Sequence, residues 1–142
     1  EVTISNDGPD PLQGVAVATA LLGAHREADA DLAAFFAQPI GRPAVPAFTL
    51  APGEARTIRI AAPRARAAIV AMEAGGRPIF VPIVAVACRF TRLGDEFRAA
   101  RAFAVGVERV DTPKLLPIWL DVPPRMYDGV AARPHPLPPG VV

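Results

Sequence analysis

Residues 12–22 read LQGVAVATALL, and this stretch decides the fold class of the chain. Val15, Val17 and Thr19 fall on one side of an extended strand, while alanines occupy most of the other side. Both sides are largely apolar, which indicates a strand that is covered on both faces. We therefore expect a sheet protein with this strand in its interior.

Shorter stretches with the same alternation lie on either side of this strand. They cover residues 1–5, 48–50, 55–61, 67–73, 79–90 and 97–107. The strand at 79–90 is expected to bend at Pro82, and Gly75-Gly76 is typical of a hairpin turn. Residues 29–38 show helical spacing instead, and Asp29 or Asp31 is expected to cap that helix. The pattern predicts a mainly β protein of about seven strands with one short inserted helix.

The composition excludes several classes of function. The chain has 142 residues, 51% of them hydrophobic, and its 15 basic and 14 acidic residues nearly cancel. That balance gives no strong field for a nucleic acid partner. A single cysteine excludes an internal disulfide and a cysteine-rich zinc site. Lys114 is the only lysine, and the abundance of arginine and alanine is typical of a GC-rich bacterial genome.

The turns between the first strands carry a family resemblance. Residues 2–8 (VTISNDG), 11–17 (PLQGVAV) and 48–54 (FTLAPGE) resemble the strand ends and the Pro-Gly turn of bacterial immunoglobulin-like modules. The resemblance implies an immunoglobulin-like antiparallel β-sandwich over residues 1–110. The expected function is a non-enzymatic binding or structural module, part of a larger protein assembly, with a location outside the cytoplasm favoured. These motifs describe turn geometry and therefore leave the ligand open.

A second resemblance gives an alternative function. The Pro-Gly turn followed by Ile58-Arg59-Ile60 is similar to the first domain of periplasmic pilus chaperones. That resemblance implies a module that lends a strand to a client protein.

Prolines recur throughout residues 111–142. Because proline lacks an N–H donor, we expect an extended C-terminal segment without regular elements. Residues 134–142 are expected to be loosely held, so that truncation after Ala132 leaves the fold intact.

One part of this C-terminal segment is apolar and contains the only tryptophan and the only tyrosine. Its candidate interaction residues are Leu115, Leu116, Ile118, Trp119, Leu120, Met126 and Tyr127. An exposed indole in an apolar stretch is costly in water. The segment is expected either to close its own domain as an edge strand or to contact a protein partner or a second copy.

Few residues suggest catalytic or metal chemistry. Cys88 lies in an apolar strand, and only His25 and His135 could serve as its base, so a small enzyme using Cys88 is an alternative rather than the expected function. A buried, unreactive thiol is expected instead. Glu27, Asp29 and Asp31 are expected to be solvated acids near a helix start, and no cofactor is predicted. The apolar run at 78–88 is too short to span a membrane.

Overall fold

The computed structural model describes residues 1–62 and 66–141 of the chain. The protein is mainly β with one α-helix, as predicted. Its elements, in chain order, are β1 (Val2–Ser5), β2 (Leu12–Gly23), α1 (Ala28–Ala37), β3 (Phe48–Leu50), β4 (Ala55–Ile58), the 3-10 helix η1 (Arg66–Ala68), β5 (Met72–Ala74), β6 (Arg77–Phe80), β7 (Pro82–Arg92), β8 (Asp95–Val107), β9 (Ile118–Trp119) and β10 (Val130–His135).

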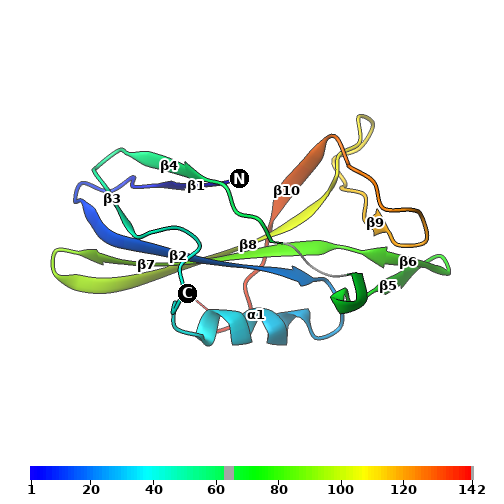
Figure 1. Cartoon of the computed structure of the whole chain (residues 1–142), viewed down its shortest axis with the longest axis horizontal. Helices are drawn as coiled ribbons and strands as arrows, with labels where there is room; N and C mark the ends of the chain where they lie inside the picture. Colours follow the sequence, from blue (N-terminus) through cyan, green and yellow to red (C-terminus); the bar gives the residue numbers. More distant parts are fainter. Residues whose placement is uncertain (63–65, 142) are drawn as a thin grey trace.

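A five-stranded antiparallel sheet forms the centre of the molecule (Figure 1). Its strand order is β10-β8-β7-β2-β3, so the long strands β2, β7 and β8 lie in its interior. The stretch at 12–22 that predicted an interior strand pairs with β7 from Gln13 to Gly23. A turn at Leu93 and Gly94, both with positive φ, joins β7 to β8.

Different elements cover the two faces of the central sheet. Helix α1 lies along one face, where Leu32 and Phe36 pack on Ile83 and on the alanines of β7 and β8. The opposite face carries Val15, Val17 and Val86, which pack with Ile58 and with the partly buried inward side chains of β1. Strands β1 and β4 form a separate two-stranded sheet over this second face. The alternation in β2 thus matches a strand that has apolar contacts on both faces.

A third, three-stranded sheet of order β5-β6-β9 extends the molecule at one end. The hairpin predicted at Gly75-Gly76 joins β5 to β6, and both glycines have positive φ. The bend expected at Pro82 is a break between β6 and β7 at Val81. At that break the Val81 carbonyl accepts a hydrogen bond of 2.9 Å from the Ala24 N–H, which is in register with the β2–β7 pairing and extends it by one pair.

Two local predictions were wrong. Residues 67–73 were predicted as one strand, but η1 ends at Ala68 and β5 begins only at Met72, in keeping with the high helix propensity of alanine. Neither Asp29 nor Asp31 caps α1, because the N-cap residue is Glu27 and both aspartates lie inside the first turn; no side chain of the described residues caps this helix. Asp31 instead accepts a hydrogen bond from His25 Nε2 at 2.8 Å.

The C-terminal segment also differs from its prediction. Residues 130–135 form β10, which pairs with β8 from Val130↔Val107 to His135↔Ala102. Proline is tolerated at position 134 because β10 is an edge strand, where an N–H that faces outward is not needed. The end of the chain was expected to be loosely held, but Leu137 and Val141, which follow β10, pack against the core beneath α1. Together with β9 and the break at Val81, β10 brings the described residues to ten strands rather than about seven.

Candidate functional site

A groove of about 540 Å³ lies on the face of the central sheet opposite α1. It is open because the β1–β4 sheet covers only part of that face. Residues Glu1 to Thr3 form one wall, and residues 130–132 at the start of β10 form the other. Ile60 and Ala62, which follow β4, complete the lining.

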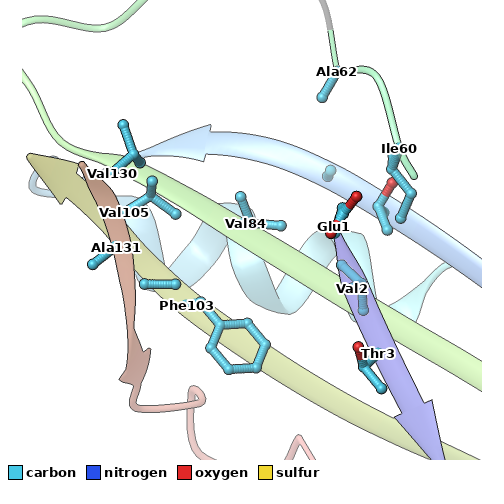
Figure 2. Close-up of a pocket in the computed structure, with 13 residues that line it drawn as sticks. Glu1, Val2, Thr3, Ile60, Ala62, Val84, Phe103, Val105, Val130 and Ala131 are labelled. Atoms are coloured by element: carbon cyan, nitrogen blue, oxygen red, sulfur yellow. The ribbon is translucent and has the colours of Figure 1, made fainter. Parts of the chain in front are cut away.

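The floor of the groove is apolar. Figure 2 shows Val84 of β7 and Phe103 and Val105 of β8 between the two walls. These three side chains are only half-buried, whereas Ile83 and Ala85, which point to the α1 face, are fully buried. Val130 at the rim is 51% exposed. The groove therefore presents apolar surface that this part of the chain leaves partly in contact with water.

The wall formed by β1 has an unpaired edge. In the described residues β1 pairs only with β4, from Val2↔Ile58 to Ser5↔Ala55. Its other edge borders the groove, since Glu1, Val2 and Thr3 line it. An edge strand of this kind offers main-chain donors and acceptors to a further strand.

The seven candidate interaction residues lie away from this groove, and most of them contact their own chain. Leu116 exchanges two main-chain hydrogen bonds with Val107, at 2.8 and 3.0 Å. Ile118 and Trp119 form β9, which pairs with β6. Leu120 donates its N–H to the Pro78 carbonyl at 3.0 Å. Leu115 approaches Gly106, where an added Cβ would lie 2.8 Å from the Leu115 Cβ.

The structure brings part of this set together in a smaller groove of about 220 Å³. Ile118, Trp119, Leu120 and Tyr127 line it, with Pro123 and Pro124 among the other lining residues. Met126 is adjacent in sequence and 93% exposed. The apolar surface here is smaller than on the open face of the central sheet.

An ion pair holds Trp119 in place beside this smaller groove. The Arg77 guanidinium donates two hydrogen bonds to the Asp121 carboxylate, at 2.7 and 2.9 Å. It also lies over the Trp119 ring, 4.0 Å from the ring centroid. The hydrogen bonds from Arg77 hold the pKa of the Asp121 carboxyl below its ordinary value. The sequence shows Arg77 only as a basic residue, and the structure gives it a positioning role.

The groups that could support catalysis are separated by the central sheet. Cys88 is half-buried, and burial raises the pKa of its thiol. It pairs with Val17 and Ala99 and so lies on the face opposite α1. His135 pairs with Ala102, whose side chain belongs to the α1 face. His25 is bonded to Asp31 at the start of α1.

Neither a metal centre nor a membrane-spanning helix is present in the described residues. Within residues 1–62 and 66–141, no three histidine, cysteine, aspartate or glutamate side chains gather as a metal site would require. In that same part of the chain, no helix has the length and apolar character needed to cross a membrane.

Comparisons with known proteins add no relative to this description. No family model, no curated protein and no solved structure matches the chain. The groove and the sheet edge beside it are therefore the basis for any functional proposal.

Sequence reasoning missed this groove. Phe103 and Val105 were recognised only as members of an alternating strand. The alternation at residues 130–134, with Val130, Ala132 and Pro134 on one side, was the available signal for the second wall. The sequence does not predict how much of the central sheet the β1–β4 sheet covers.

Proposed function

We propose that this chain is a non-enzymatic binding module with an immunoglobulin-like β-sandwich architecture that belongs to a larger protein assembly. The observation that carries the proposal is the apolar groove of about 540 Å³ on the open face of the central sheet. A partner protein occupies this groove and covers Val84, Phe103 and Val105.

The energetics of burial support a protein partner. Covering apolar side chains gains about 25 cal/mol for each Å² removed from water. A floor that spans β7 and β8, with walls from β1 and β10, suits a chain segment. Small-molecule sites usually place several polar groups around an apolar pocket. Here the described lining is dominated by valine, alanine, isoleucine and phenylalanine.

The placement of Cys88 supports a role without catalysis. A cysteine nucleophile needs a nearby base and a lowered pKa. The pKa of Cys88 is raised, and His135 lies on the opposite face of the sheet. A small enzyme that uses Cys88 is therefore disfavoured.

The exposed Met126, next in sequence to the groove residue Tyr127, favours a second contact surface within the same assembly. Methionine and aromatic side chains are enriched where proteins meet. This surface would be a secondary contact, since most of the apolar segment at 115–120 already packs on its own chain.

Site-specific photo-crosslinking in cells that make the chain tests the main proposal. A benzoylphenylalanine at Val130, on the groove rim, should give a discrete protein adduct. The same probe at Leu93, which is 79% exposed in the β7–β8 turn, should not. The substitution Ala132→Arg, at an exposed position in the groove, should abolish the adduct, whereas Ala30→Arg on the exposed side of α1 should leave it unchanged. Equal adducts from both probes, or none from Val130, would refute the proposal.

A further inference from the structure

The geometry of the groove points to one kind of occupant. Resting on the function proposed above, we propose that the partner inserts an extended strand that pairs with the free edge of β1. Its inward side chains are apolar except at one position, which carries a carboxylate that faces Arg101.

The alternation of hydrogen-bonded and non-bonded pairs between β1 and β4 shows which main-chain groups of β1 could bond to this strand. The Asn6 N–H donates to the Glu54 carbonyl at 2.9 Å, one step beyond the pair Ser5↔Ala55. Since hydrogen-bonded and non-bonded pairs alternate along an antiparallel ladder, the pairs of Ile4 and Val2 with β4 are bonded ones. The N–H and C=O groups of Thr3 and Ser5 therefore point away from β4, toward the free edge.

An independent contact agrees with this alternation. Thr3 Oγ1 and Thr57 Oγ1 lie 2.8 Å apart. Directly opposed side chains approach more closely in non-bonded pairs, which is where this alternation places Thr3 and Thr57. A strand added at this edge can thus take main-chain hydrogen bonds from Thr3 and Ser5 without displacing any bond to β4.

The floor of the groove sets the side-chain pattern of the added strand. Val2 and Ile4 are the inward residues of β1, so a neighbouring strand in the same layer also points alternate side chains at the central sheet. Those side chains would meet Val84, Phe103 and Val105. The expected pattern is therefore apolar at every second position.

The charge beside the floor adds a specific requirement. Arg101 pairs with Val86 and lies two residues before Phe103 on β8, so it is on the same face as the groove. Its side chain is exposed, and it donates to the Ala100 carbonyl at 2.8 Å. Within the described part of the chain it has no ion-pair partner, unlike Arg89, Arg109 and Arg133. A carboxylate at an inward position of the added strand would supply the ion-pair partner that this guanidinium lacks in the described residues.

A second copy of this chain fits the site poorly. If its β1 paired with this β1 and faced the same floor, its own β8 and β10 would occupy the space of the first copy's β8 and β10. If it were turned over, the polar outer side chains of its β1 and β4, such as Thr3, Thr57 and Arg59, would face the apolar floor. A flexible segment from a different protein has neither difficulty.

Selection from a displayed library of random peptides about ten residues long tests the side-chain pattern, since strands rarely exceed that length. The Ala132→Arg variant serves for counter-selection. We expect enriched peptides with apolar residues at alternate positions and Asp or Glu at an even spacing from them. Selection on Arg101→Glu should replace that acid by Lys or Arg. Enrichment without alternation, or an acid preference that Arg101→Glu does not change, would overturn the proposal.

A matched pair of variants tests the main-chain pairing with one enriched peptide as the probe. Thr3→Pro removes the outward N–H, whereas Thr3→Val removes only the hydroxyl. Loss of one main-chain hydrogen bond should weaken binding about tenfold in Thr3→Pro, with Thr3→Val close to the unmodified chain. Equal affinity of the two variants would overturn strand addition.

The two proposals fail in different ways. If the Val130 adduct is abolished by Ala132→Arg but unchanged by Thr3→Pro, a partner occupies the groove without pairing to β1, and only the strand proposal is lost. If the probe at Val130 gives no adduct, or gives one that Ala132→Arg does not abolish, the groove is not a binding site and both proposals are lost.

Discussion

Cys88 shows how the fold restrains a single reactive residue. Its thiol is half-buried on β7, and burial raises its pKa, so less thiolate is present at neutral pH than in an unfolded chain. We expect labelling of the native protein at pH 7 to be at least about tenfold slower than labelling in urea at the same pH. The chain has one cysteine, so a disulfide reagent reports on Cys88 alone. Equal rates in the two conditions would contradict this expectation.

Gly106 is a residue that the packing of the C-terminal segment requires. A Cβ at this position would lie 2.6 Å from the Leu116 carbonyl oxygen and 2.8 Å from the Leu115 Cβ. Gly106→Ala should therefore push the segment at 115–116 away from β8 and lower the free energy of unfolding by about 1–3 kcal/mol.

Urea denaturation measures this change, and Gly41→Ala is the matched control. A Cβ added at Gly41 would have no atom within 4 Å, and the φ of Gly41 is not positive, so alanine there should change stability by less than about 0.5 kcal/mol. An unchanged midpoint in Gly106→Ala would show that the segment moves aside at little cost.

At the scale of elements, the β6–β9 pairing should depend on pH. The pKa of Asp121 is lower in the folded chain than in the unfolded one because Arg77 donates hydrogen bonds to the carboxylate. The ion pair between Arg77 and Asp121 therefore stabilises the fold in full above pH about 3.9, the ordinary pKa of an aspartate. This contribution is lost as the pH falls through the lower pKa that Asp121 has in the folded chain. Because Arg77 also covers the Trp119 ring, loss of the ion pair should shift Trp119 emission to longer wavelength at acid pH.

Two variants separate this local change from general acid unfolding. Asp121→Asn should show the shifted emission already at neutral pH. Asp111→Asn removes the ion pair with Arg109 elsewhere and should keep the acid transition of Trp119. If the emission of the Asp121→Asn variant equals that of the unmodified chain at pH 7, Arg77 and Asp121 do not hold β9.

The elements also show where sequence reasoning succeeds. Strand β2 and helix α1 were predicted because their own apolar spacing defines them. Strand β10 was not, because Pro134 argues against a strand unless its position at the sheet edge is known. The cap of α1 was also mistaken. The helix begins one residue earlier than predicted, with Glu27 at the N-cap and no side-chain cap from the described residues, and Asp31 in the first turn bonds to His25 instead.

At the scale of the whole molecule, the C-terminal residues belong to the fold. Truncation after Gly129 removes β10 together with Leu137 and Val141, which pack on the core beneath α1. We expect a loss of about 3–5 kcal/mol in the free energy of unfolding, a large share of the stability of a chain this size. Truncation after Pro139 keeps β10 and Leu137 and should lower the free energy of unfolding much less. Equal urea midpoints for the two truncations would contradict this account.

The groove could not be predicted from the sequence, because it forms only when distant segments of the chain come together in the folded molecule. Its floor comes from β7 and β8, its walls come from the two ends of the described chain, and no single segment contains its pattern. The apolar composition of the floor was visible at Phe103 and Val105. Their partial exposure depends on how far β1 and β4 reach across the sheet.

The strand edges have a consequence for behaviour at high protein concentration. The outer strands of the central sheet are poor templates for aggregation, since β3 has three residues and β10 carries Pro134. Strand β1 is also short, with four residues, but VTIS contains no proline and no charge and its outer edge is unpaired in the described residues. When the groove is empty, fibril-like stacking should begin at this strand, and a bound partner should keep the protein soluble.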